Sequence, residues 1–169
     1  MANAGTKALH ILVEDEVARA VLREIIRRVD AQFLRTVEIV IGGDRDAIKR
    51  TMQALRAAHL PLAAVRDGDT GANPQQSLFS LPGSRPPEKE IFDCAPVLAQ
   101  LRDNYGLAVH NFMTTVDQND HHSWFGRLAA TVSTDEICII NECARAYVAS
   151  LTENERDSLV QQLKAAIPR

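Results

Sequence analysis

The sequence predicts an α/β fold in which a four-stranded, mainly parallel sheet is flanked by helices and followed by a helical C-terminal extension. The first hundred residues alternate short β-type runs with helical periodicity, the pattern of a parallel sheet covered by crossover helices. After about Tyr105 the strand signals fade, and apolar residues recur at helical spacing. We therefore divide the chain into a core domain over 1–110 and an extension over 111–169.

The predicted strands are short apolar runs bounded by polar or glycine residues. They cover 10–13, 37–41, 62–65 and 77–81. An i, i+4 stripe of apolar residues from Val17 to Val29 predicts an amphipathic helix after the first strand. Asp44 is the expected N-cap of the next helix, because its carboxylate can accept a hydrogen bond from a free backbone N–H group.

The chain beyond the fourth strand is predicted to be mainly helical. Residues 82–87 form a Pro/Gly-containing turn, helix resumes near Glu88, and 111–120 is expected to be a loop. Two or three helices follow, because 133–136 and 152–155 both fit the Ser/Thr-x-x-Glu capping box that begins helices.

Composition limits the class of protein. Hydrophobic content of 46% and charged content of 24% are ordinary for a globular domain, and a net charge of −3 gives no global attraction to nucleic acid or anionic membranes. The three cysteines show no CxxC spacing, which argues against a zinc cluster or a disulfide framework. No segment has the length of a membrane span or a signal peptide, so we expect a cytoplasmic protein with no membrane partner.

Carboxylates follow three of the four predicted strands. Glu14 follows the first strand, Asp67 and Asp69 follow the third, and Glu88 and Glu90 lie just beyond the fourth. The carboxyl ends of strands in an open α/β sheet meet at one edge, where such folds place their sites. Clustered carboxylates repel each other unless a cation neutralises them, and hard oxygen ligands favour Mg²⁺ or Mn²⁺. The sequence therefore predicts a divalent-metal site, with isolated caps and turns as the plainer interpretation.

One family with such a site is the receiver domain of bacterial response regulators. Residues 11–16, Ile-Leu-Val-Glu-Asp-Glu, resemble its opening, where an acidic pair binds Mg²⁺, and Asp67 would be the phosphoacceptor. The resemblance weakens further along the chain. The fourth strand ends in Leu81-Pro82 instead of a hydroxyl residue, and the sequence has no Lys-Pro dipeptide. The receiver is retained as an alternative.

The order of the acidic residues more closely resembles the Toprim pattern, which has a Glu after the first strand, Asp-x-Asp after the third and a further acid downstream. Segments 79–90 and 120–125 also resemble stretches of the ATP-dependent endonucleases of the OLD (overcoming lysogenization defect) family. The resemblance spans roughly 9–147. It implies a Rossmann-like Toprim core that acts as a metal-dependent DNA endonuclease or nickase, with a non-catalytic Toprim scaffold as a further alternative.

The same resemblance implies partners. The substrate would be DNA, and an ATP-binding cassette-type ATPase would lie upstream in the polypeptide or act in trans. Related modules often form dimers, so a homodimer is also an expectation.

The resemblance assigns roles to the acidic residues. The expected metal ligands are Glu14, Asp67, Asp69, Glu88 and, as alternate to Glu88, Glu90. The expected catalytic residues are Glu14, Glu16, Asp67, Asp69, Glu88 and Lys89. OLD nucleases often carry a second Glu where this chain has Ala18, and Asp15 replaces the usual Gly. One ion is therefore expected, while a second depends on Glu16 or Glu90. Glu16 is otherwise a general base or a solvated helix-start acid.

Basic residues near the acids are candidates for contact with nucleic acid. Arg85 and Lys89 flank the acids after the fourth strand, where a positive charge would stabilise the transition state. Arg19, Arg23 and Arg27 share one face of the first helix and could follow a phosphate backbone, although a solvated helix face is the plainer interpretation.

Two adjacent histidines complete the candidate site. His121 and His122 begin a predicted helix, and either could approach the acidic edge and support a metal ligand. The plainer interpretation is a pair that points to solvent and core.

Overall fold

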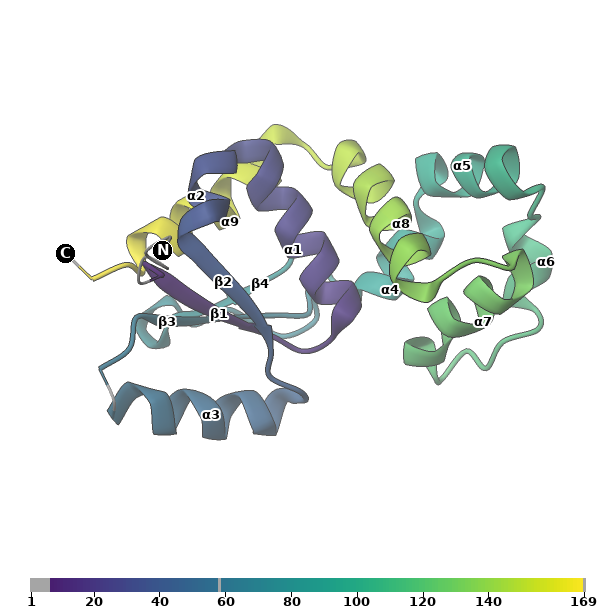
Figure 1. Cartoon of the computed structure of the whole chain (residues 1–169). Coiled ribbons are helices and arrows are strands. Elements are labelled where there is room, and N and C mark those ends of the chain that lie inside the picture. The colour runs from purple at the N-terminus through teal and green to yellow at the C-terminus, as the bar shows by residue number, and fades with distance from the viewer. Residues whose placement is uncertain (1–6, 58, 169) are drawn as a thin grey trace, which may run out of the picture.

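The computed structural model describes residues 7–57 and 59–168 (Figure 1). Its strands are β1 (Leu9–Val13), β2 (Val37–Ile41), β3 (Leu62–Arg66) and β4 (Leu78–Ser80). They form one sheet in the order β2-β1-β3-β4, and every neighbouring pair is parallel. The predicted α/β class with a four-stranded sheet is confirmed.

Helices connect and follow the strands. They are α1 (Glu16–Val29), α2 (Ala31–Thr36), α3 (Arg45–Ala57), α4 (Pro87–Asp93), α5 (Ala95–Tyr105), α6 (Val109–Met113), α7 (Trp124–Val132), α8 (Glu136–Ser150) and α9 (Glu153–Ala165). Short 3-10 helices cover Pro74–Gln76 and His121–Ser123. None of the helices in the described part of the chain is long and apolar enough to span a membrane.

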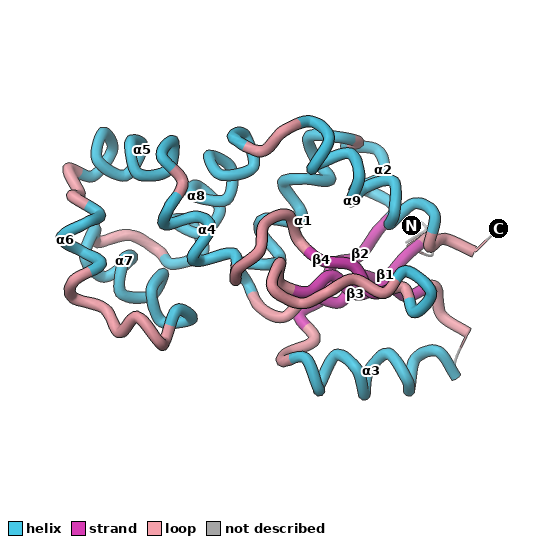
Figure 2. Tube along the Cα trace, turned by 180° about the vertical axis from the view of Figure 1, so that it is seen from behind, coloured by secondary structure: helices cyan, strands magenta, loops and turns pink. Residues whose placement is uncertain are grey.

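The sheet is covered on both faces. In Figures 1 and 2, α1 and α9 lie over one face and α3 lies over the other. Side chains alternate between the faces along each strand. Ala63 and Val65 of β3 therefore join the large core beneath α1, while Leu62 and Ala64 join a smaller core beneath α3. By the same alternation Arg66, the last residue of β3, lies on the α3 side.

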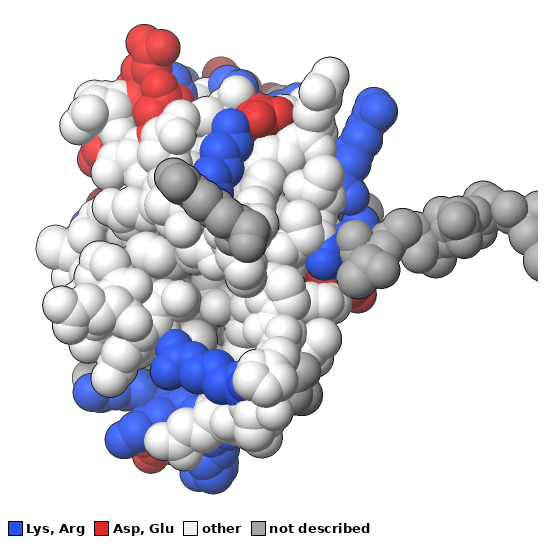
Figure 3. All heavy atoms as spheres, turned by 90° about the vertical axis from the view of Figure 1, so that its left-hand side faces the viewer, with Lys and Arg blue, Asp and Glu red and all other residues white. Residues whose placement is uncertain are grey.

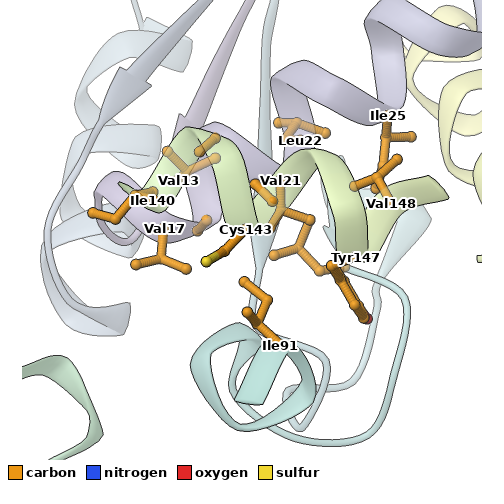
Figure 4. Close-up of a cluster of buried hydrophobic side chains, with 14 of the residues drawn as sticks. Val13, Val17, Val21, Leu22, Ile25, Ile91, Ile140, Cys143, Tyr147 and Val148 are labelled. Carbon is orange, nitrogen blue, oxygen red and sulfur yellow. The ribbon is translucent and has the colours of Figure 1, made fainter. Parts of the chain in front are cut away.

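Helix α8 returns along α1 and packs on it through apolar side chains (Figure 4). Val17 and Val21 of α1 lie with Ile91 of α4 and with Ile140 and Val148 of α8, and all five are buried. Burying each such side chain stabilises the fold by roughly 1.5–3 kcal/mol relative to leaving it in water. The packing fixes α4 and α8 against α1, at the edge of the sheet.

Helices α5, α6 and α7 lie beside the sheet instead of on it (Figure 1). An aromatic cluster joins α6 and α7 to α4. The ring centroid of Phe92 lies 5.9 Å from that of Phe112, 5.6 Å from that of Trp124 and 5.2 Å from that of Phe125. The segment after α6 is thereby held close to the start of α4.

The proposed boundary at residue 110 falls inside α6. Helix α9, within the predicted extension, contacts α1 and β4 of the predicted core. The division into 1–110 and 111–169 stays a prediction.

Two local predictions are wrong. The expected loop over 111–120 begins with the last turn of α6, because Val109 and Phe112 lie on one helix face and are both buried. Residues 133–136 do not form a capping box. Ser133 ends α7 with a φ of 54°, and the Asp135 side chain caps α8 by accepting from Cys138 N.

Two other capping predictions are confirmed, and a further helix, besides α6, was missed. Thr152 and Glu155 form a capping box at the start of α9, and Asp44 accepts a hydrogen bond of 2.7 Å from Ala47 N at the start of α3. Helix α2 was not predicted. It is only six residues long, and its N-cap is Asp30, whose carboxylate accepts from two backbone N–H groups.

Candidate metal centre

The ends of β1 and β3 and the start of α4 bring acidic side chains to one edge of the sheet. Glu14 and Asp15 follow β1, Asp67 follows β3, and Glu88 lies in the first turn of α4. Their charges act on one another, because Asp15, Asp67 and Glu14 each contribute to raising the pKa of Glu88. Asp15, Asp67 and Glu14 therefore lie close enough to Glu88 for their charges to act on it.

Local sequence fixes each of these positions. Asp15 is the N-cap of α1, and its Oδ1 accepts a hydrogen bond of 2.9 Å from Ala18 N. Pro87 begins α4, where its fixed φ favours the first helical turn and its missing N–H group costs no hydrogen bond. Glu88 follows it directly, so the helix start determines where this carboxylate points.

The loops that carry Asp67 and Glu88 touch through their backbones. A Cβ atom on Gly68 would lie 2.9 Å from the carbonyl carbon and oxygen of Gly83, which is closer than real Cβ contacts allow. Gly83 has a φ of 106°, and a Cβ there would lie 2.9 Å from Oε1 of Glu90. Glycine at both positions permits the close approach.

Asp67 and Glu88 are buried, with exposed fractions of 5% and 1%. Oδ1 of Asp67 and Oε2 of Glu88 have no hydrogen-bond partner among the described residues. A buried polar atom without a partner costs free energy, and an unpaired buried charge costs considerably more. A cation between these carboxylates would supply what both oxygen atoms lack, so the residues present fit a metal ion.

Burial also changes the titration of the cluster. Desolvation, followed by repulsion from the neighbouring carboxylates, raises the pKa of Asp67 to about 7 and the pKa of Glu88 to about 8. Desolvation is also the largest cause of the raised pKa of Glu14. Without a cation, Glu88 is therefore mostly protonated near neutral pH, and Asp67 is partly protonated.

The histidine pair lies against the same cluster. Nδ1 of His122 lies 3.4 Å from Oδ2 of Asp15 and 3.6 Å from Oε1 of Glu88. The rings of His121 and His122 lie against each other with centroids 4.1 Å apart and an interplanar angle of 39°. One ligand atom from each of Glu88, His121 and His122 lies within 4.8 Å of the others, so these three residues form a group that could hold a metal ion.

Packing explains why the histidines reach this position. Trp124, directly after the 3-10 helix that carries them, is buried and donates a hydrogen bond of 2.8 Å from Nε1 to the Asp117 carbonyl. Its ring packs edge-on against Phe92 of α4. The aromatic cluster thus ties the histidines to the helix that carries Glu88.

Other expected acidic ligands have basic partners or lie at the rim. Glu90 accepts hydrogen bonds from Arg85 and from Ser84 N, and Glu16 accepts from Arg19 at 2.7 Å. Asp69 is exposed, but its charge contributes to the raised pKa values of Glu14 and Asp67. None of these three side chains is buried as Asp67 and Glu88 are.

Most of the arginines expected to contact nucleic acid already form ion pairs with carboxylates of this chain. Arg27 forms an ion pair of 2.7 Å with Glu24, and Arg85 pairs with Glu90 and with Asp93, at 2.5 Å in the latter case. Arg23 is exposed. Much of the charge on α1 is therefore compensated within the helix, as Arg19 is by Glu16.

Lys89 is half-buried. It lies near the histidines, since its charge contributes to lowering the pKa of His121. Asp15, which belongs to the acidic pair of the receiver alternative but departs from the Toprim pattern, also acts on Glu88 through its charge. Its position directly after Glu14 and before a helix was the available sequence signal.

Metal-free protein is expected to lose stability as the pH rises. In the unfolded chain Asp67 and Glu88 titrate near pH ~4, whereas their folded pKa values are about 7 and about 8. Between these limits the folded state holds protons that the unfolded state has released, so the free energy of unfolding falls with increasing pH. Melting temperatures in EDTA should be lower near pH ~8.5 than near pH ~6, where the raised carboxyl groups remain protonated.

Saturating Mn²⁺ should reduce this pH dependence by favouring the ionised carboxylates. Melting temperatures in EDTA that are flat or rise over the same interval would contradict the assignment of two protonated buried carboxyl groups.

No protein-family model and no curated protein sequence matches this chain. Solved structures do match it. Two structures of the C-terminal region of the Xanthomonas campestris pv. campestris OLD protein, phased with iodine and with platinum, are each 13% identical to it. The first has a TM-score of 0.51 and covers 96% of this chain and 97% of that chain. The second has a TM-score of 0.50, with 95% and 92% covered. The chain thus shares the fold of that region.

The receiver alternative expects a doubly wound sheet of five strands in the order 2-1-3-4-5. In the described residues the sheet ends at β4, and the chain beyond it is helical. No structural observation favours that alternative.

Proposed function

We propose that this protein is a metal-dependent DNA endonuclease or nickase module of the OLD type, which hydrolyses phosphodiester bonds. The observation that carries the proposal is the buried pair Asp67 and Glu88, each with an oxygen atom that lacks a partner, at the strand-end edge of the sheet. The fold shared with the C-terminal region of an OLD protein supports it, as do the segments 79–90 and 120–125 that resemble OLD nucleases.

We assign the first ion to the carboxylates of Glu14, Asp67 and Asp69. Glu88 would contact both this ion and a second one. The second ion was expected to depend on Glu16 or Glu90, but both carboxylates have arginine partners. Glu88, His121 and His122 offer an alternative second position. Because imidazole nitrogen suits transition metals better than Mg²⁺, we expect Mn²⁺ to support activity better than Mg²⁺.

A divalent ion held here would lower the pKa of an attacking water and stabilise the charged oxygens of the phosphate. Side chains of the protein would bind and orient around such an ion. Asp67 and Glu88 release their protons when the ion binds, and Asp15 keeps Nδ1 of His122 facing the cluster at 3.4 Å.

The partners follow from the same proposal. DNA is the substrate, and an ATP-binding cassette-type ATPase domain or subunit controls access to it. A homodimer would place two such centres on one DNA molecule.

The direct test is cleavage of supercoiled plasmid DNA. We expect nicked circles to accumulate with Mn²⁺, more slowly with Mg²⁺, and not in EDTA. Calorimetry with Mn²⁺ alone measures binding separately from cleavage. Tight Mn²⁺ binding without nicking, also after addition of a cognate ATPase, would refute the nuclease and favour the non-catalytic scaffold.

A further inference from the structure

A groove of about 570 Å³ lies between α3 and the loop that joins β3 to β4. Its floor includes Ile48 and Met52, which belong to the small core beneath α3. It lies on the face of the sheet opposite α1, and none of the candidate metal ligands lines it. The groove is therefore separate from the acidic cluster, although the residue after Arg66 is Asp67.

One face of α3 supplies a row of cations to this groove. Arg45, Lys49 and Arg56 all line it. At 100° per residue these three positions fall within an arc of about 40° and extend for about 16 Å along the helix. Figure 3 shows that Lys and Arg side chains gather over the end of the molecule formed by α3. Asp46 is the only carboxylate among the described residues that line the groove.

Arg66 adds a buried cation to the wall of the groove. Its exposed fraction is 8%, and one of its terminal nitrogens donates to the Gly71 carbonyl. Nε has no partner, and the guanidinium forms no ion pair with any residue in the described ranges 7–57 and 59–168. A buried charge without a counter-charge is costly. Arg66 acts on Glu14 through its charge but forms no ion pair with it, so an anion in the groove would supply the direct partner that Nε lacks.

The spacing of the cations identifies the kind of anion. A single phosphate cannot meet charges at both ends of a row about 16 Å long, whereas a nucleic-acid strand carries a phosphate every ~3.4 Å along the duplex axis. The arginines of α1 are less suitable, because Glu16 and Glu24 already pair with Arg19 and Arg27. The α3 row has no such compensation from ion pairs among the described residues.

We propose that the groove between α3 and the β3–β4 loop binds the phosphate backbone of the DNA segment adjacent to the cleaved bond. This inference rests on the proposed function, because it takes DNA as the substrate. Arg66 and Asp67 are consecutive and belong to the groove and to the acidic cluster respectively. One DNA strand can therefore pass from the metal centre into the groove, where Arg45, Lys49 and Arg56 follow its phosphates.

The test compares two neighbouring cations on the same helix. Lys49 and Arg50 are both exposed, but only Lys49 lines the groove. Binding of the full chain to a fluorescent DNA duplex is measured by anisotropy in EDTA, over NaCl concentrations of about 50 to 200 mM. Lys49→Gln should weaken binding about fivefold to tenfold near 0.1 M salt and reduce the slope of log K against log salt by about 0.9. Arg50→Gln should leave both quantities close to the wild-type values.

Equal losses in Lys49→Gln and Arg50→Gln, or no loss in either, would overturn the proposal. So would the absence of DNA binding by the wild-type chain. Strong competition by inorganic phosphate or a free mononucleotide, beyond its effect on ionic strength, would assign the groove to a small anion instead. Because no divalent ion is present, these results are independent of plasmid nicking, which tests the proposed nuclease by itself.

Discussion

Asp67→Asn is expected to abolish divalent-dependent DNA cleavage and, in the absence of metal, to make the protein more stable. The amide keeps the shape of the side chain but removes a charged ligand. Replacing groups that merely support a metal ligand already costs 10–100-fold, so nicking should fall by at least about 100-fold. The gain in stability has the opposite sign because Asp67 is buried among other carboxylates that raise its pKa to about 7.

At pH ~8.5, above that pKa, the wild-type side chain is ionised at a cost in the folded state. The neutral amide avoids this cost, although its own burial offsets part of the gain, so the free energy of unfolding should rise by about 1–3 kcal/mol. Urea denaturation in EDTA measures it. Asp103→Asn, an exposed carboxylate on α5, is the matched control and should change neither quantity. Loss of cleavage together with loss of stability would mean that Asp67 is only a structural residue.

Phe92→Ala is expected to destabilise the protein by about 3–5 kcal/mol, the usual cost of removing a buried aromatic ring. The ring is 4% exposed and lies between Phe112, Trp124 and Phe125, so its removal leaves a cavity where α4, α6 and α7 meet. Urea denaturation measures the loss. Phe92→Leu, which retains most of the volume, should cost less than about 1.5 kcal/mol.

The same change should also weaken metal binding, because the ring connects the helix of Glu88 to the segment of the histidine pair. Calorimetry with Mn²⁺ under conditions where the variant is folded should show a lower affinity than for wild type, while Phe92→Leu keeps most of it. Unchanged Mn²⁺ affinity in a folded Phe92→Ala variant would show that His121 and His122 do not contribute to binding.

The sheet could be predicted because its information is local. Each strand is a short apolar run closed by an acid, a glycine or a polar turn, and parallel pairing then brings Glu14 and Asp67 to one edge. The carboxyl end of a strand is a position that sequence can identify. The distance between Asp67 and Glu88 in the fold could not be predicted from local sequence, since it depends on how the loop after β4 folds back.

The surroundings of the acids depended on contacts between distant segments. His122 reaches Asp15 only because the aromatic cluster around Phe92 folds α6 and α7 against α4, and no local pattern encodes that contact. The compensated arginines of α1 were different. Glu16 and Glu24 precede Arg19 and Arg27 by three residues, a spacing that predicts ion pairs along a helix. That signal was available and pointed away from α1 as a phosphate-binding face.

The contact between Gly68 and Gly83 determines how the acidic cluster can behave when its charge changes. Two loops that meet backbone to backbone cannot relax their separation by rotating a side chain, as two flexible surface acids would. The mutual repulsion of Asp67 and Glu88 is therefore held in place by main-chain atoms, and relief has to come from outside in the form of a proton or an ion. Folding therefore already holds the carboxylates in place, and binding a cation requires little further structural adjustment.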